Sequence, residues 1–264
     1  MRAAYPALLS SHFRTLLQYR AAAIAGAGTQ LFFGLVRMMI FDGFYASSDA
    51  AQPMTHEDVT TYIWLGQAMF LVTLLGVDRE IALMIRSGNV AYEMVRPLDL
   101  YTLWFVRSLS GRAAPLLMRA APIAILAGLF FGLGPPASFA AALLFAASAL
   151  GGLIMAASLI TLLTISMLWT ISGEGISRLA PPLIFFFSGI LLPLPFFPNW
   201  LQPVIQALPF RGLIDTPFQI YLGNLAGASA LTAVTLQLVW IAVLVLAGRA
   251  LLARGLRRLI VQGG

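Results

Sequence analysis

The chain has 264 residues, of which 60% are apolar and only 10% are charged, and its mean hydropathy is +0.89. Soluble globular domains contain about 45–50% apolar and about 25% charged residues, so this composition excludes that class. Six membrane spans of about 20 residues each would use about 120 residues of the chain. The composition therefore predicts an all-α polytopic membrane protein.

The residue types that are missing exclude most enzyme classes. All 16 basic residues are arginine, so the chain has no lysine for a Walker A loop or a Schiff base. It also has no cysteine, and His12 and His56 are too few for a histidine-rich metal site. We therefore expect no catalytic residue, metal or cofactor. The net charge of +6 is attributed to arginine on the cytoplasmic side of a membrane, and not to a nucleic-acid partner.

The first residues precede any long apolar run. Residues 4–20 place leucine and phenylalanine on one helical stripe, with serine, arginine and glutamine mostly on the other side. This pattern predicts an amphipathic helix at the membrane surface. The alternative is that these residues are the hydrated leading end of the first span.

Six apolar stretches follow, and they predict six membrane-spanning helices at about residues 21–41, 60–77, 114–133, 139–170, 174–192 and 229–252. The fifth is apolar mainly from Leu179, shortly before Pro193. It is therefore expected to begin near Glu174 or to be broken.

The arginines predict the orientation of these spans. If the N-terminus is cytoplasmic, the inner segments contain 14 of the 16 arginines, and only Arg37 and Arg211 fall towards the outside. The first outer loop is instead acidic, with Asp42, Asp49 and Asp58. Because cytoplasmic loops carry an excess of arginine and lysine, both termini are expected in the cytoplasm.

Two connections between spans have unusual compositions. The inner segment 78–113 is amphipathic and is interrupted at Ser87-Gly88-Asn89 and at Arg96-Pro97, which predicts short helices. The outer segment 193–227 is almost uncharged and rich in proline and aromatic residues. This composition is typical of short re-entrant helices that dip back into the membrane.

Few residues could act on a substrate inside the membrane. No Asp or Glu lies within a span away from its ends, so a proton relay is not expected. Arg37 is the one charge well inside an apolar run; it either snorkels or pairs with Asp42 or Asp58, or it faces a substrate cavity. Four phenylalanines could stack against an aromatic or cationic substrate, although packing or lipid anchoring is the alternative: Phe130, Phe131, Phe185 and Phe186.

Three stretches together resemble the permease subunits of ABC-2 type exporters. The first is Ile85-Arg86-Ser87-Gly88-Asn89-Val90-Ala91-Tyr92-Glu93-Met94-Val95-Arg96-Pro97-Leu98, which is similar to that family's element ending in Arg-Pro-Leu after the second span. The others are Ser188-Gly189 with the prolines up to Pro198-Asn199-Trp200-Leu201, and Leu208-Pro209-Phe210 with Pro217 to Gly223. In order and topology, the resemblance covers essentially the whole chain. Within the family, the chain looks most like bacterial viologen-exporter and daunorubicin-resistance-like permeases.

The resemblance implies a single permease domain over residues 1–264, with a connecting helix at 4–20, a cytoplasmic coupling segment at 78–113 and a re-entrant outer segment at 193–227. It implies ABC ATP-binding subunits and a second permease, identical or paralogous, as partners in the lipid bilayer of the bacterial inner membrane. The residues expected to couple the permease to the ATPase are Arg86, Asn89, Tyr92, Glu93, Arg96 and Asp99.

The function expected from the sequence is the membrane permease of an ATP-driven exporter. Drug-like organic cations, other hydrophobic toxins and lipids all remain possible substrates. The main alternative is a secondary carrier or channel that works alone, but such proteins often show intramembrane acids or inverted repeats, which this sequence lacks. An intramembrane hydrolase and a structural anchor are further alternatives.

Overall fold

The chain is described by a computed structural model that covers residues 10–11, 13–15, 20–47, 50–170 and 174–257. Within these ranges it consists of helices and their connections, with no strand, as the sequence predicts. The amphipathic helix expected at residues 4–20 lies mostly outside the described residues.

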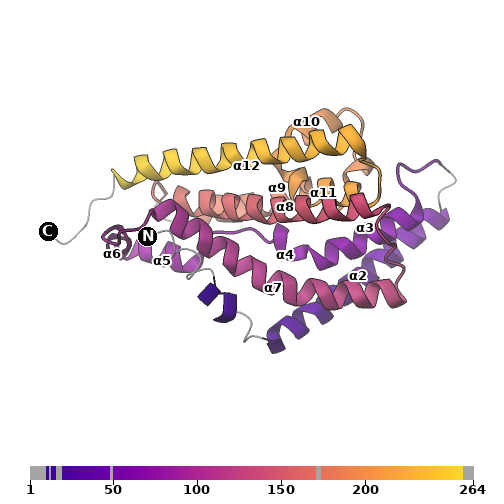
Figure 1. Cartoon of the computed structure of the whole chain (residues 1–264), viewed down its shortest axis with the longest axis horizontal. Coiled ribbons are helices and arrows are strands. Elements are labelled where there is room, and N and C mark those ends of the chain that lie inside the picture. Colours follow the sequence, from indigo (N-terminus) through magenta and orange to yellow (C-terminus); the bar gives the residue numbers. More distant parts are fainter. Residues whose placement is uncertain (1–9, 12, 16–19, 48–49, 171–173, 258–264) are drawn as a thin grey trace.

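Four helices in the described ranges are long and apolar enough to cross a membrane: α2 (Arg20–Ser47), α7 (Leu100–Phe130), α8 (Phe139–Ser166) and α12 (Gly227–Leu256). Their 28 to 31 residues correspond to about 42–46 Å at a rise of about 1.5 Å per residue, more than the roughly 30 Å of a hydrocarbon core. They correspond to the first, third, fourth and sixth predicted spans. In Figure 1 they run along the length of the molecule.

The second and fifth predicted spans are shorter in the structure. The second consists of α3 (His56–Ala68) and the single turn α4 (Phe70–Thr73), and the chain is then non-helical until Asp78. The fifth is α9 (Glu174–Phe187), which follows residues 171–173, outside the described ranges, and ends just before Gly189, whose φ of +90° stops the helix. Neither helix alone reaches the length of a membrane span.

The outer segment 193–227 folds into short elements, as its composition predicts. They are the 3-10 helices η1 (Leu194–Phe196) and η2 (Pro209–Leu213) and the α-helices α10 (Gln202–Ala207) and α11 (Asp215–Tyr221). Nearly all of α11 is buried, and it packs against α8. This segment therefore belongs to the folded body of the protein.

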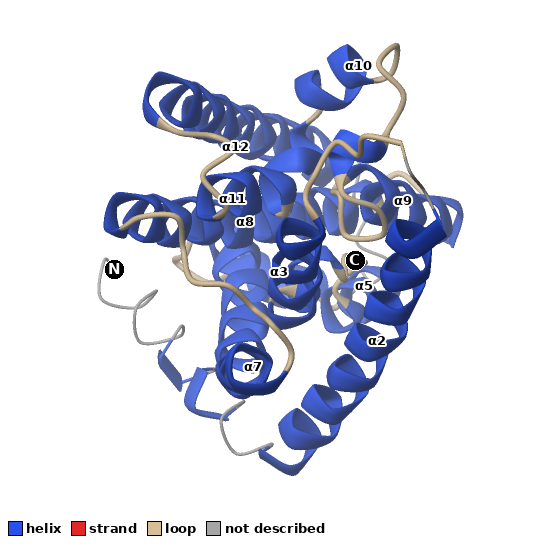
Figure 2. Ribbon diagram, turned by 90° about the vertical axis from the view of Figure 1, so that its right-hand side faces the viewer, coloured by secondary structure: helices blue, strands red, loops and turns tan. Residues whose placement is uncertain are grey.

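Helix α8 is at the centre of the packing. It contacts α7, α11 and α12, and Figure 2 shows it beside α3 with the other long helices around them. Small residues allow these close contacts: a Cβ on Gly152 would lie 2.9 Å from the carbonyl oxygen of Leu213. The buried Gln237 amide of α12 donates to the carbonyls of Ser148 and Gly212, and so joins α12 to α8 and η2.

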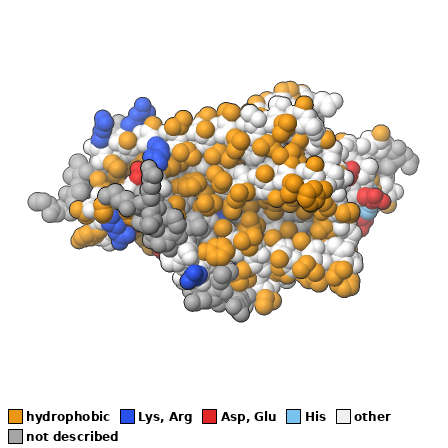
Figure 3. Space-filling model, viewed as in Figure 1, with side chains coloured by type: hydrophobic (Ala, Val, Ile, Leu, Met, Phe, Trp, Pro, Cys, Tyr) orange, Lys and Arg blue, Asp and Glu red, His pale blue; other side chains and the backbone are white. Residues whose placement is uncertain are grey.

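The surface has two different ends separated by an apolar band. Figure 3 shows arginine gathered at the end that carries α5 and α6, and acidic groups with histidine at the opposite end, where α3 begins. At that opposite end His56 pairs with Asp42 at 2.7 Å. The band between the ends exposes large side chains such as Phe32 and Met39 of α2 and Leu129 of α7, as expected for a lipid-facing surface.

The packing of α2 on α3 provides a stability test. A Cβ on Gly34 would lie 2.5 Å from the ring of the fully buried Trp64, whereas nothing lies within 4 Å of a Cβ on Gly28 of the same helix. We expect Gly34→Ala to lower the free energy of unfolding by about 1–3 kcal/mol through overpacking. The matched control Gly28→Ala should be neutral or stabilising by up to about 1 kcal/mol. Equal thermal unfolding midpoints for the two detergent-purified variants would contradict this packing.

Candidate functional site

The arginine-rich end is built around residues 78–99, called here the connecting segment, which links α4 to α7. It contains α5 (Arg79–Arg86) and α6 (Val90–Met94). One buried side chain from each helix, Ile81 and Val90, packs with Trp104 of α7. The same apolar cluster includes Ile165 of α8 and Leu252 of α12. The connecting segment is therefore docked onto the ends of three long helices.

Asp78 fixes the start of the segment. Its carboxylate accepts hydrogen bonds from the backbone N–H groups of Glu80 and Ile81, at 3.0 and 3.1 Å, and so caps α5. Its own N–H donates to the Thr164 hydroxyl of α8 at 3.0 Å. The Asp78 cap, a local feature, and the long-range hydrogen bond from Asp78 to Thr164 together determine where α5 begins.

The two breaks predicted in the segment occur where expected. Gly88 has a φ of +76°, a conformation that glycine adopts without a steric penalty, and it lies between α5 and α6. The segment turns again at Arg96-Pro97, after which α7 begins at Leu100. Residues 100–113, expected within the inner segment of short helices, are instead the first turns of α7, which begins directly after its cap Asp99 and continues through Gly111 and Pro115.

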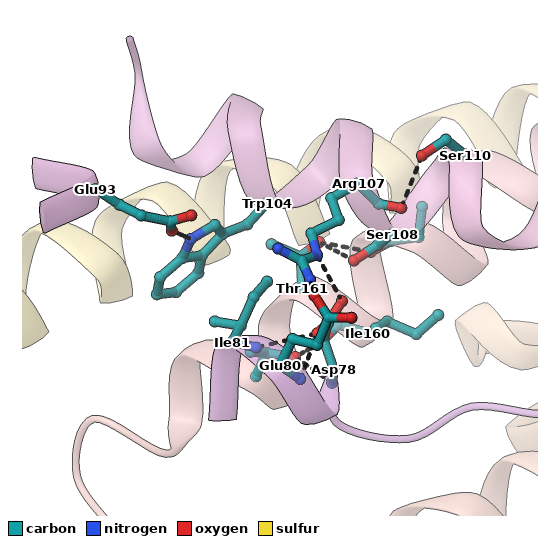
Figure 4. Close-up of polar contacts among 12 residues, drawn as sticks. Asp78, Glu80, Ile81, Glu93, Trp104, Arg107, Ser108, Ser110, Ile160 and Thr161 are labelled. Carbon is teal, nitrogen blue, oxygen red and sulfur yellow. Dashed lines mark hydrogen bonds and ion pairs between the residues drawn. The ribbon is translucent and has the colours of Figure 1, made fainter. Parts of the chain in front are cut away.

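Arg107 of α7 holds the beginning of the segment. Figure 4 shows its guanidinium group between the carboxylates of Asp78 and Glu80, and its Nε lies 3.5 Å from Asp78 Oδ2. In the structure these two acids pair with an arginine of the same chain. An ion pair with several partners restrains the segment more than an isolated surface pair would.

Glu93 holds the other end of the segment. Its side chain was expected at the partner surface, yet the residue is only 8% exposed, and its carboxylate accepts a hydrogen bond of 2.8 Å from the Trp104 indole (Figure 4). A buried carboxylate is stable only when it is hydrogen-bonded. Glu93 therefore faces the body of its own chain, and its contact with Trp104 holds α6 against α7.

The other five predicted coupling residues are exposed on the connecting segment: Arg86, Asn89, Tyr92, Arg96 and Asp99. Tyr92 and the neighbouring Val95 are 73% and 81% exposed. We call Tyr92, Met94, Val95 and Arg96 the exposed tip. It combines apolar side chains with one arginine on a segment that is held from behind by Glu93.

Asp99 performs a second role at the base of the segment. It caps α7 by accepting a hydrogen bond from the backbone N–H of Thr102, and it lies 3.2 Å from the guanidinium of Arg249 on α12. Burial alone would raise the pKa of Asp99, but the hydrogen bonds from Thr102 and the charge of Arg249 outweigh this and lower it below the usual value. Asp99 therefore stays ionised and links α7 to α12.

The structure does not bring the five predicted substrate-path residues together. Arg37 donates a hydrogen bond of 2.8 Å to the carbonyl of Leu191, just after α9, rather than pairing with Asp42, which contacts His56. This contact joins α2 to the irregular chain that follows the fifth predicted span. A carbonyl freed by the break after α9 is thereby satisfied.

The four phenylalanines lie in separate packing environments. Phe131 stacks on Trp64 with ring centroids 5.0 Å apart, while the neighbouring Phe130 is exposed. Phe185 makes an edge contact with Phe70, and Phe186 is partly exposed beside Phe187 and Phe197. All four of these ring contacts are aromatic packing within the protein, which was the alternative to substrate binding.

Asp215 and its neighbours form a buried polar cluster that the sequence did not indicate. This residue is 4% exposed, and its carboxylate accepts hydrogen bonds from Tyr62 of α3 at 3.3 Å and from Gln219 at 3.1 Å. Arg211 lies 3.8 Å away. The only signal in the sequence was an Arg–Asp pair, four residues apart, in an otherwise uncharged segment. Tyr62 could not be connected to it, because 153 residues separate the two.

The comparisons with known proteins identify the family. The sequence model described as "ABC-2 family transporter protein" matches residues 31–263, which is most of the chain. No curated protein and no solved structure matches the chain. The match includes the connecting segment, the long helices α7, α8 and α12, the second part of α2, and the outer segment with its buried acid. The chain belongs to the ABC-2 family of transporter proteins and is a multi-pass membrane component of a transporter.

Proposed function

We propose that this chain is the membrane permease subunit of an ATP-driven ABC exporter in the bacterial inner membrane. Membership of the ABC-2 family supports the transport role, and permeases of this family generally work with ABC ATP-binding subunits. In the proposal the chain crosses the membrane six times as a single permease domain over residues 1–264, and it pairs with a second permease, identical or paralogous. ATP hydrolysis takes place on separate subunits.

The distribution of charge supports an orientation with both termini in the cytoplasm. Arginines gather at the end of the molecule that carries the connecting segment, whereas His56 and Asp42 mark the opposite end. The positive-inside rule assigns the arginine-rich end to the cytoplasm. α3 with α4 and α9 then serve as the second and fifth spans, shortened at their ends, and the outer segment 193–227 re-enters from the outside.

Cysteine labelling tests this orientation without background, because the chain has no cysteine. Ser87 and Ala228 are both exposed, the first between α5 and α6 and the second in the first turn of α12. We expect an impermeant maleimide to label Ala228→Cys in intact spheroplasts and Ser87→Cys only after permeabilisation. External labelling of Ser87→Cys would reverse the orientation.

The exposed tip is the surface that supports ATPase docking best. It projects Tyr92 and Val95 from the proposed cytoplasmic end, and an exposed tyrosine beside apolar and arginine side chains is typical of an interface. The contacts of Arg107 and Glu93 restrain the segment that carries the tip. A restrained segment can transmit movement between an ATPase and α7, whereas a loose loop would absorb it.

Substitution of the tip tests the docking. We expect Tyr92→Ala to reduce copurification of the ATP-binding partner subunit at least tenfold and to abolish export, because a tyrosine that is an interface hot spot contributes about 2 kcal/mol or more. Arg96→Ala should also reduce both copurification of the ATP-binding subunit and export. The matched control is Trp200→Ala, a 76% exposed aromatic beside α10 at a distance from the segment.

Membrane insertion should be normal in all three variants. If Tyr92→Ala and Arg96→Ala both retain export and ATPase association, the tip is not the docking surface. Vesicles of the purified permease that drive substrate movement without any ATPase would instead support a stand-alone carrier or channel.

The sequence resemblance to viologen-exporter and daunorubicin-resistance-like permeases supports a hydrophobic or cationic drug-like substrate, with lipids as a further class. In this proposal the substrate passes along the interface between the two permeases. Arg37 and the phenylalanines Phe130, Phe131, Phe185 and Phe186 remain candidates for the path. Of these, Phe130 and Phe186 have the most exposed rings. Arg37 donates a hydrogen bond to the carbonyl of Leu191.

A further inference from the structure

Two adjoining cavities flank the non-helical stretch Gly76–Val77, which connects α4 to α5. The first, of about 270 Å³, lies between the start of α5 and α7, and its lining includes Arg79, Arg107 and Arg112. The second, of about 410 Å³, is lined by apolar side chains of α5 and the end of α8, together with Arg79 and Arg86. Arg79 lines both cavities, so the two form one continuous region of the surface.

The first cavity has an excess of positive charge. It contains two carboxylates, Asp78 and Glu80, and both contact Arg107, while Asp78 also caps α5. The charges of Arg79 and Arg112 face the same cavity. The Nε of Arg112 is buried and has no hydrogen-bond partner among the described residues. Because a buried donor is costly to leave unsatisfied, this cavity is suited to an anion with several acceptor oxygens.

The second cavity indicates that the anion is attached to an apolar group. Ala82, Leu83 and Met167 give it an apolar wall beside the arginines. Both cavities lie beside the start of the connecting segment, and Arg112 precedes the third predicted span, which begins at about residue 114. In the proposed orientation the cavities are therefore near the cytoplasmic interface of the membrane. A ligand that is anionic at one side and apolar at the other, at the membrane interface, is a phospholipid.

We propose that these cavities bind one anionic phospholipid, with its phosphate between Arg79 and Arg112 and its glycerol and upper acyl region against Leu83 and Met167. The lipid would satisfy the Arg112 donor and fill the space between α5 and α7. A zwitterionic lipid fits less well because its ammonium group would meet the surplus arginine charge. The residues that line the two cavities include none of the exposed tip and none of the candidate path residues.

Native mass spectrometry of the purified full-length chain tests the site. The chain is titrated with phosphatidylglycerol, with phosphatidylcholine of the same acyl chains, or with phosphatidylglycerol in the presence of inorganic phosphate. We expect one phosphatidylglycerol to bind at least tenfold more tightly than phosphatidylcholine. Arg112→Gln and the exposed Arg79→Gln should each weaken it about tenfold or more, as expected for the loss of a charge-assisted hydrogen bond.

The matched control is Arg254→Gln, an exposed arginine in the last turn of α12 at the same end of the molecule, which should bind within twofold of wild type. Arg79→Gln is a surface change, so it remains informative even if Arg112→Gln does not fold. Equal affinity for the two lipids, or equal loss in Arg254→Gln, would overturn the proposal. Displacement of the lipid by an equimolar amount of phosphate would overturn the lipid assignment in favour of a free anion. The assay requires no ATPase, so its result is independent of the proposed coupling.

Discussion

The Glu93 carboxylate accepts a hydrogen bond from the Trp104 indole in a place that water hardly reaches, since Trp104 is 0% exposed. A carboxylate removed from water without a partner costs several kcal/mol, so separation of these two groups is strongly opposed. The position of α6 on α7 depends on this contact. Arg107 restrains α5 mainly through the partly buried Asp78, whereas its second partner, Glu80, is exposed. Together with the packing of Ile81 and Val90 on Trp104, these contacts define the position of the exposed tip at the end of the bundle.

This arrangement separates the residues that hold the connecting segment from those that face outward. Asp78, Glu93 and Arg107 make polar contacts within the chain, whereas the side chains of Tyr92 and Val95 are mostly exposed. In the proposed function the first group keeps the tip rigid and the second group meets the ATPase. The lipid proposed between α5 and α7 would add to the rigidity, because it fills the cavity beside Arg107.

Local signals in the sequence predicted much of the fold. Hydrophobic length identified the four long helices, and the breaks at Gly88 and Pro97 followed from the backbone preferences of glycine and proline. The family assignment from three short stretches is also confirmed. These features depend on residues close together in the chain, which is why a single sequence reveals them.

Features set by distant contacts were not predictable. The inward direction of Glu93 depends on Trp104, and the burial of Asp215 depends on Tyr62, 153 residues away. The contact of Arg37 with the Leu191 carbonyl likewise depends on where α9 ends. The sequence shows which positions carry a charged side chain. Whether that side chain faces the protein or the solvent depends on neighbours that are distant in the sequence and that only folding brings close.

Hydrogen–deuterium exchange of residues 79–98 in the purified full-length chain tests most directly whether the Glu93–Trp104 contact restrains the connecting segment. Trp104→Phe keeps a ring in place but leaves the buried carboxylate without its donor, and we predict exchange in α6 at least about tenfold faster than in wild type. Glu93→Gln keeps an acceptor for the indole and should stay within about threefold of wild type. Unchanged exchange in Trp104→Phe, or equally fast exchange in Glu93→Gln, would contradict this account.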